Sequence, residues 1–331
     1  MIYKKKYLPV WIKEPTYVFF DESKRIPVNI AKWHAICFFS DNINLNEKIK
    51  VKIYEKRHRS VYQYLERNYY YVLQSSKKYS AGSFVANAPI WLFWWQGEEN
   101  MPELVKKCKK SVLTNRGKHP VILITKDNFF HYVNLPDHII QKLHNNAITL
   151  THFSDILRVN LIADYGGFWL DATIFCSSPL KEEIFIKPIF TGKNPGGDKY
   201  NISQWRWTGY AIYGWKNNIL FCILKDLFNE YWRKEKYLID YYLIDYMICF
   251  VYNNVNLVRS LLDDIQINNK NQNLLQEEFN QLYTPEKFDY LLNNETWLYK
   301  LTWKQNYSLH TSEGRDTMYY KWCQFIDNTI I

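Results

Sequence analysis

The sequence lacks the patterns that mark several common classes of protein. Its six cysteines include no pair at the C-x-x-C spacing of a zinc ribbon or a thioredoxin-like site. No apolar run approaches the roughly 18–20 residues of a membrane-spanning helix, since even residues 241–252 are interrupted by Asp245. A dinucleotide fingerprint, a P-loop, an H-E-x-x-H motif and a G-x-S-x-G elbow are also missing. The corresponding nucleotide-binding, metalloprotease and hydrolase classes are therefore not supported.

Cysteine usage and the N-terminus favour a reduced compartment. Several cysteines lie within apolar runs, where a free thiol packs as a small hydrophobic group. Residues 1–15 start with a basic run but contain no adequate apolar core, so no signal peptide is predicted. We expect a cytoplasmic protein that lies on the membrane surface if it meets a membrane.

Aromatic residues and basic charge are plentiful. Aromatics make up 18 % of the chain, and 42 Lys and Arg against 33 Asp and Glu give a formal charge of +9. This excess suits an anionic partner such as nucleic acid, anionic lipid or a phosphorylated small molecule, with a merely solvated basic face as the alternative. Nucleic acid is not expected, because no RRM, KH or zinc-finger pattern is present.

The chain divides into two regions that differ in composition and hydrophobic pattern, with an approximate boundary at residues 80–88. Residues 1–85 are basic, aromatic and mostly helical in pattern. Residues 86–331 alternate apolar strand-like runs with helical segments, which predicts an α/β domain with a mixed, mostly parallel sheet flanked by helices. The strand candidates are residues 90–95, 120–125, 168–171, 184–191 and 207–213, and the helical candidates are residues 102–113, 137–144, 151–164 and most of 217–263.

The most informative segment is residues 154–176, SDILRVNLIADYGGFWLDATIFC. Asp155 and Arg158 are neighbours on one face of the predicted helix, and a double glycine then leads into a strand that ends at Asp171. Ligands of open α/β sheets bind at the carboxyl ends of strands, where a carboxylate can hold a ribose hydroxyl or a cation on a pyrophosphate. Taken singly, Asp155 and Arg158 are more typical of a surface ion pair, and Asp171 is as typical of a turn at a strand end as of a site. Their combination favours a site.

This combination resembles the DXD region of sugar-nucleotide-dependent glycosyltransferases, in the family of yeast initiating mannosyltransferases and clostridial glucosylating toxins. The chain is more closely similar to bacterial capsular polysaccharide synthesis glycosyltransferases over roughly residues 25–310. The segments that carry the likeness are IWLFWWQGEENMPELVKKC, LPDHIIQK, SDILR, YGGFWLDATIFC and LIDYYLIDY. The resemblance implies a GT-A-like fold, a UDP-sugar donor and retention of the anomeric configuration.

The resemblance also implies roles for individual residues. Trp95, at the end of the first strand, corresponds to the residue that stacks on uracil; we expect strand alternation to bury Trp94 and to turn Trp95 toward the site. Asp155 and Arg158 match residues that bind the donor sugar hydroxyls. Asp171 matches the first acid of DXD, which contacts the ribose, the sugar or a metal ion.

One departure from the family pattern concerns the metal. Thr173 stands at the second acidic position, so Asp171 would be the one carboxylate of the motif available to Mg²⁺ or Mn²⁺. Trp303 and Lys304 belong to a C-terminal segment that closes on the diphosphate in relatives. Either a metal held by Asp171 or a cation such as Lys304 or Arg315 would neutralise the leaving UDP. His310 is a weaker metal-ligand candidate, since a lone histidine is more often structural.

Other candidates are supported by the residues alone. Asp245 lies in an apolar helical run, where a carboxylate is typically paired or functional, so it is a candidate for acceptor binding or catalysis. Residues 192–200 are rich in glycine and fit either a mobile lid or an ordinary hairpin loop. An acceptor site or simple core packing would equally explain the cluster of Trp205, Trp207, Thr208 and Gly209.

The expected activity is therefore transfer of a hexose or N-acetylhexosamine from a UDP-sugar to a growing capsular or surface polysaccharide. In the pathway that the resemblance implies, the acceptor is linked to polyprenyl diphosphate at the inner face of the plasma membrane. Residues 1–85, with basic runs at 4–6 and 56–59, would dock on anionic lipid there. The alternative is a noncatalytic relative that binds a nucleotide-sugar or a carbohydrate.

Overall fold

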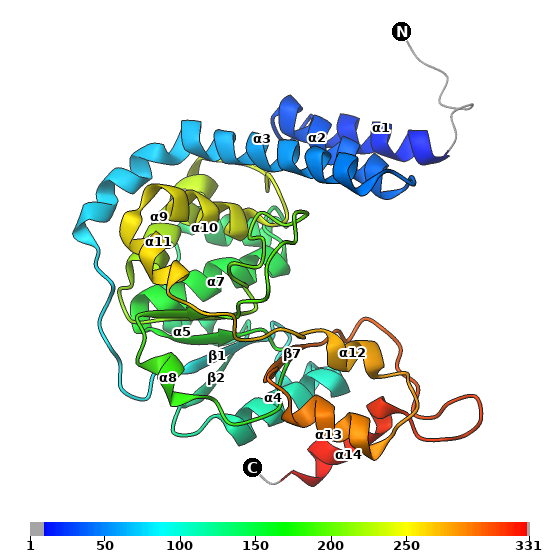
Figure 1. The fold of residues 1–331 in the computed structure, drawn as a ribbon. Coiled ribbons are helices and arrows are strands. Elements are labelled where there is room, and N and C mark those ends of the chain that lie inside the picture. Colours follow the sequence, from blue (N-terminus) through cyan, green and yellow to red (C-terminus); the bar gives the residue numbers. More distant parts are fainter. Residues whose placement is uncertain (1–9, 330–331) are drawn as a thin grey trace.

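A computed structural model describes residues 10–329, which begin with a layer of helices (Figure 1). These are α1 (Val10–Glu22), α2 (Val28–Asp41) and α3 (Glu47–Gln74), followed by the short 3₁₀ turn η1 (Ser75–Lys78). The predicted helical N-terminal region is confirmed. The basic run at residues 4–6 lies outside the described residues.

A five-stranded sheet forms the centre of the molecule, in the order β2-β1-β3-β6-β5. Its strands are β1 (Ile90–Phe93), β2 (Val121–Ile124), β3 (Gly167–Leu170), β5 (Ile189–Thr191) and β6 (Ala211–Gly214). β1 runs parallel to β2 and β3, whereas β6 is antiparallel to both β3 and β5. Within this sheet β6 alone runs against the other strands, so the predicted α/β class with a mixed, mostly parallel sheet is confirmed.

Helices cover one face of the sheet, and the N-terminal layer packs on these helices. The main core joins the sheet to α7 (Leu150–Tyr165), α9 (Ile219–Lys234) and α10 (Leu243–Asn254), and it includes Val61, Leu65 and Tyr69 of α3. Figure 1 shows α3 lying across α9 and α10. These three residues are spaced four apart, so they share one face of α3, and this face is buried against the domain that carries the sheet.

Alternation along the strands separates two hydrophobic cores. Trp91 and Trp169 point into the main core under α7, whereas Leu92 and Phe168 point to the opposite face. Four predicted strands are shorter than expected: β1 ends at Phe93, β2 spans Val121–Ile124, β5 begins only at Ile189, and the strand predicted at 207–213 begins only at Ala211. The first two residues of the strand predicted at 184–191 lie in the helical turn α8, because Glu182 and Glu183 favour the first turn of a helix.

A smaller unit lies beside the sheet and contains a second, two-stranded sheet. In it, β4 (Ile174–Cys176) pairs antiparallel with β7 (Leu298–Lys300), with Ile174 opposite Lys300. This pairing brings Lys300 next to the residues that follow β3. The remaining elements are η2 (Glu98–Asn100), α4 (Glu103–Asn115), α5 (Phe129–Tyr132), α6 (Asp137–His144), α8 (Glu182–Phe185), α11 (Asn256–Asp263), α12 (Leu274–Glu278), α13 (Pro285–Asn293) and α14 (Met318–Asn328).

The double glycine after α7 is required by geometry. Gly166 and Gly167 have φ angles of 72° and 116°, which side chains of L-residues rarely adopt. A Cβ on Gly167 would lie 2.4 Å from the carbonyl oxygen of Pro89 and 2.7 Å from Nε1 of Trp91. These glycines let the chain reverse from α7 into β3, which places Asp171 at the strand end.

The basic run at residues 56–59 is only in part a solvated patch. Lys56 and Arg59 are exposed, but His58 is buried and Arg57 donates hydrogen bonds to Asp240. Arg57 therefore stabilises the fold through Asp240 and is not part of the exposed basic surface that could meet lipid.

Two further findings concern the helices and the cysteines. Across residues 10–329, no helix is both long and apolar enough to cross a bilayer. All six cysteines are unpaired, and Cys323 is the one that is not buried.

Candidate functional site

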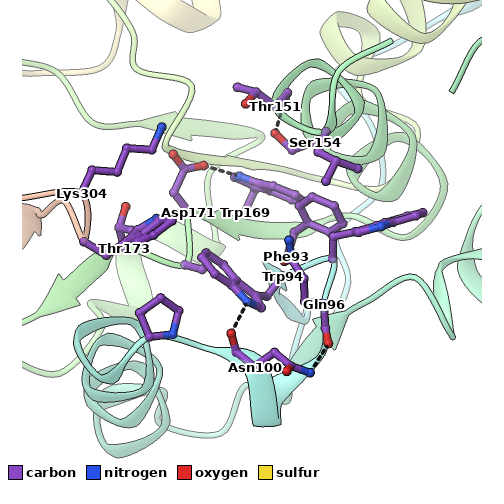
Figure 2. A pocket seen from close by; sticks show the side chains of 15 residues that line it. Phe93, Trp94, Gln96, Asn100, Thr151, Ser154, Trp169, Asp171, Thr173 and Lys304 are labelled. Carbon is purple, nitrogen blue, oxygen red and sulfur yellow. Dashed lines mark hydrogen bonds between the residues drawn. The ribbon is translucent and has the colours of Figure 1, made fainter. Parts of the chain in front are cut away.

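A cavity of about 510 Å³ opens at the carboxyl ends of β1 and β3 (Figure 2). Its walls come from the turn after β1, the first turns of α7, the residues after β3 and the segment after β7. They are Phe93, Trp94, Trp95, Gln96, Asn100, Pro102, Leu150, Thr151, Ser154, Trp169, Asp171, Ala172, Thr173, Trp303 and Lys304. Its position is the one at which open α/β sheets bind ligands.

Both tryptophans after β1 line this cavity. Because β1 ends at Phe93, Trp94 and Trp95 lie in the following turn, and strand alternation does not assign one to the core and one to the site. The Trp95 ring lies 5.8 Å from Phe129, whereas Trp94 pairs edge to face with Trp303 at 5.9 Å. The cavity thus has an aromatic end beside β1.

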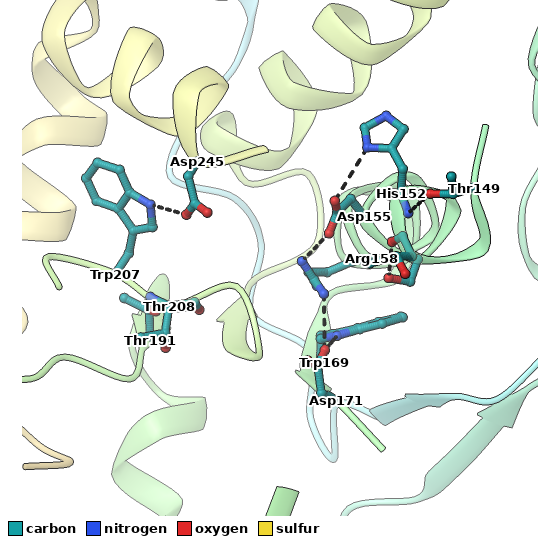
Figure 3. A network of polar contacts seen from close by, with 12 residues as sticks. Thr149, His152, Asp155, Arg158, Trp169, Asp171, Thr191, Trp207, Thr208 and Asp245 are labelled. Carbon is teal, nitrogen blue, oxygen red and sulfur yellow. Dashed lines mark hydrogen bonds and ion pairs between the residues drawn. The ribbon is translucent and has the colours of Figure 1, made fainter. Parts of the chain in front are cut away.

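Asp171 is the centre of a charged network at the other end of the cavity. Its Oδ1 accepts hydrogen bonds from Nη2 of Arg158 (3.1 Å) and Nε1 of Trp169 (2.9 Å), as Figure 3 shows. Its Oδ2 accepts from Nζ of Lys300 at 2.7 Å. Burial alone would raise the pKa of Asp171, but Lys300 and Arg158 outweigh burial and lower the pKa to about 2. Asp171 is therefore ionised at all physiological pH values.

Arg158 connects Asp171 to α7. Its Nη1 donates to Oδ1 of Asp155 at 2.7 Å, and its guanidinium lies over the Trp169 ring at 4.9 Å. The side chain is only 6 % exposed, so the pair with Asp155 is not a surface salt bridge. A Cβ on Gly209 would lie 3.0 Å from Nη1, so a side chain there would press on the guanidinium. The pattern S-D-x-x-R thus builds a buried, fixed cation.

A second cavity, of about 230 Å³, adjoins the first and shares Thr151, Ser154 and Asp171 with it. Lys300 and Asp245 lie in its wall. The rest of the lining is Asp155, Arg158, Asn201, Ser203, Trp205, Trp207, Thr208, Gly209, Tyr210, Tyr241, Tyr242 and Ile244. The structure thus brings the predicted residues of α7, the strand end, the tryptophan cluster and α10 to one enclosed space.

Asp245 faces this second cavity from α10, opposite Arg158 (Figure 3). Its Oδ1 accepts a hydrogen bond from Nε1 of Trp207 at 2.9 Å. Burial raises the pKa of Asp245 to about 7, against the opposing effect of the Trp207 bond. A carboxyl that titrates near neutral pH in a polar cavity is typical of functional sites.

Replacing Asp245 with asparagine is expected to stabilise the protein, and more so at pH 8 than at pH 4. Between its ordinary pKa of 3.8 and the folded pKa of about 7, the unfolded chain releases the proton and the folded chain keeps it. The free energy of unfolding of the wild type therefore falls through this window, by up to about 4 kcal/mol in total. Asparagine retains an acceptor for Trp207 and removes this loss.

Denaturant unfolding of both proteins at several pH values measures this gain. Asp264→Asn, at an exposed position on the end of α11, serves as the control and should change the stability little. A constant difference between Asp245→Asn and wild type from pH 4 to pH 8 would show that Asp245 does not titrate in this window.

The residues around Asp171 do not fit a divalent metal. In the described part of the chain, no group of three or more His, Cys, Asp or Glu side chains could hold an ion. Nζ of Lys300 bonds both Oδ2 of Asp171 and Oγ1 of Thr173, at 2.7 and 2.9 Å. A metal ion would have to displace this ammonium group to reach both Asp171 and Thr173.

Other predicted residues lie elsewhere. Arg315 pairs with Glu313, and His310 lies 3.3 Å from Asp316; neither lines the two cavities. Residues 192–200 fall within the long connection between β5 and β6, where the Tyr200 ring packs 4.8 Å from Tyr54 of α3.

Lys300 is the main residue that the sequence analysis missed. It stands in an ordinary stretch, LYKLT, more than a hundred residues beyond Asp171. Its place depends on the register of β7 against β4, and the isolated sequence carries no signal for that pairing.

Comparison with known proteins identifies one relationship. The model of the family described as capsular polysaccharide synthesis protein matches residues 3–322. Neither the curated proteins nor the solved structures include a match to the chain.

Proposed function

The chain belongs to the family of capsular polysaccharide synthesis proteins, and from this premise we propose that it is a retaining glycosyltransferase. The donor is a UDP-linked hexose or N-acetylhexosamine, and the acceptor is a growing capsular glycan. One observation carries the proposal: a charged network at the junction of two adjoining cavities, in which Asp155 and Arg158 are buried and Asp171 and Lys300 are half-buried. A nucleotide-sugar has two unlike halves and needs such a pair of spaces.

The proposed donor pose follows the lining. The uracil ring lies against Trp95 at the aromatic end of the first cavity, and the diphosphate lies between Lys304 and Lys300. The sugar then enters the second cavity, where the carboxylate of Asp155 and the guanidinium of Arg158 meet its hydroxyls. The lining thus changes from aromatic in the first cavity to polar and charged in the second, as the donor changes from its uracil ring to its sugar hydroxyls.

The chemistry requires stabilisation of the departing diphosphate. The bond between the anomeric carbon and the β-phosphate oxygen breaks, its electron pair stays on the phosphate, and the sugar passes through an oxocarbenium-like state. The acceptor oxygen bonds to the anomeric carbon, and its proton passes to the departing phosphate. Fixed positive groups aimed at the developing charge lower this barrier. Lys300 and Lys304, between which the diphosphate lies, are such groups, and Lys300 takes the part that a metal ion plays beside a second acid.

Replacing Trp95 with alanine is expected to weaken UDP binding by about five- to hundredfold, since base stacking on an aromatic ring contributes about 1–3 kcal/mol. Titration calorimetry with UDP measures the change and also tests whether the chain binds the nucleotide at all. Trp94→Ala is the matched control, because Trp94 lines the same cavity but pairs with Trp303. A loss confined to Trp94→Ala would assign the stacking face to Trp94, and wild-type protein without affinity for UDP would contradict the proposed donor.

We also propose that the acceptor is linked to polyprenyl diphosphate and that the N-terminal helices meet anionic lipid at the inner membrane surface. Lys56 and Arg59 are the exposed members of the basic run on α3. Changing both to alanine is expected to weaken binding to phosphatidylserine vesicles by about 2 kcal/mol, at about 1 kcal/mol per charge. Sedimentation with vesicles measures this, with Lys118→Ala combined with Lys270→Ala as control. Equal binding by both double variants would contradict the docking surface.

A further inference from the structure

A third cavity, of about 730 Å³, lies beneath the N-terminal helices. Three segments that are distant in sequence enclose it: helices α1 to α3, the residues before α7, and the connection between α9 and α10. Its lining is Val18, Glu22, Arg25, Ile26, His34, Cys37, Phe38, Asp41, Tyr54, Arg57, Asn145, Asn146, Ala147, Thr149, Tyr237, Leu238, Ile239, Asp240 and Tyr241. This volume is within the range of small-molecule and cofactor sites.

The third cavity adjoins the second one. Tyr241 lines both, and the residue is 61 % exposed. Thr149 lines the third cavity, while Thr151, two residues along, lines the other two. A molecule held in the third cavity can therefore extend past Tyr241 to the donor sugar.

The wall that carries Tyr241 is tied to the N-terminal helices. The Asp240 carboxylate has no exposed surface; it accepts hydrogen bonds from Nη2 of Arg57 (2.7 Å) and pairs with Nε2 of His34 (3.0 Å). His34 in turn pairs with Glu22 through Nδ1 at 2.8 Å. These bonds link α1, α2 and α3 to the connection before α10, so the cavity is a built space rather than a gap between loops.

The charges of the lining differ from those of the donor cavities. Three acids, Glu22, Asp41 and Asp240, and three basic groups, Arg25, Arg57 and His34, line the cavity, so the charges of its wall balance. Four of these groups are bonded to one another, so the wall offers paired rather than free charges. Such a mixed set of donors and acceptors suits hydroxyl groups, each of which can both donate and accept a hydrogen bond. The remaining faces include the Tyr54, Tyr237 and Tyr241 rings, which offer flat apolar contact. The ligand class that fits is a neutral glycan rather than a nucleotide or a free phosphate.

We propose that the third cavity binds the acceptor glycan and that Tyr241 marks its passage to the reaction centre. This inference rests on the proposed function for its consequence, since only a glycosyltransferase needs an acceptor there. It gives the N-terminal helices a part in substrate recognition, separate from any contact with lipid.

The test measures binding of glycan and nucleotide separately. Oligosaccharides are released by partial hydrolysis from the capsular polysaccharide of the organism that encodes the chain. They are titrated into the full chain, and UDP is titrated in parallel. Arg25→Ala and Tyr237→Ala each change one residue that lines the third cavity and neither donor cavity. Arg67→Ala and Tyr290→Ala are the matched controls, at exposed positions that line none of the three cavities.

We expect the dissociation constant of the oligosaccharide to rise about tenfold in Arg25→Ala and Tyr237→Ala, with UDP affinity unchanged and both controls like wild type. Equal glycan affinity in all five proteins would overturn the inference, as would wild-type protein that binds UDP but no capsule oligosaccharide. Failure of the proposed function gives a different result. The chain would then bind the glycan through Arg25 and Tyr237 but would have no affinity for UDP. The glycan site would be supported, and the proposed UDP-sugar donor would be wrong.

Discussion

Asp171→Asn is expected to lower the rate of UDP-sugar turnover by about 10²- to 10³-fold, the loss typical of removing one preorganised electrostatic group. Asparagine has the size of aspartate and still accepts from Trp169. It carries no charge, so it no longer fixes Lys300 and Arg158, whose nitrogens lie 2.7 and 3.1 Å from the carboxylate. Lys300 would then lose the geometry that directs it at the diphosphate, and Arg158 the geometry that directs it at the sugar hydroxyls.

Single-turnover release of UDP measures this effect without the acceptor. Asp164→Asn is the matched control, because Asp164 also lies on the path from α7 to β3 and pairs with Lys225 at 2.6 Å. It lines none of the cavities, so the control should turn over donor like wild type. Asp171→Asn with unchanged turnover would remove Asp171 from the mechanism.

Lys300→Met is expected to lower kcat by about 10²- to 10³-fold, and added Mn²⁺ should not restore the rate. The ammonium group is the cation that bonds both motif positions, Asp171 and Thr173. Methionine keeps much of the length and apolar volume of the stem and removes the charge. The wild-type enzyme should retain its activity in EDTA, since the neutralising charge belongs to the chain itself.

The conservative variant separates charge from packing. Lys300→Arg should recover a substantial part of the lost rate, while Lys270→Met, on an exposed ion pair with Glu295, should leave the rate unchanged. Loss of wild-type activity in EDTA, with recovery on adding Mn²⁺, would contradict the role given to Lys300 and would assign the diphosphate to a metal ion.

Local signals in the sequence were enough to predict one half of the site. Three local patterns lie between residues 150 and 170. They are the helical spacing of α7, the two glycines that allow a tight reversal, and the short apolar run of β3. Together they place Asp155, Arg158 and Asp171 without knowledge of the rest of the fold. The α/β class followed from the same alternation of helix and strand patterns.

The other half depends on contacts between distant segments. Lys300 reaches Asp171 because β7 pairs with β4, and the third cavity exists because Arg57 and His34 of the N-terminal helices bond Asp240. Neither the β4–β7 pairing nor the bonds to Asp240 correspond to a periodic pattern in the sequence. The turn after β1 shows the same limit, since strand alternation applies to Trp94 and Trp95 only if the strand extends to them.

The most direct test of a nucleotide-sugar site is release of UDP from a panel of UDP-sugars by wild-type protein in EDTA, with Asp171→Asn alongside. We expect slow turnover of one donor that survives the chelator and is lost in the variant. If the wild-type protein neither turned over a UDP-sugar nor was stabilised against heat by UDP, the two adjoining cavities would not be a nucleotide-sugar site.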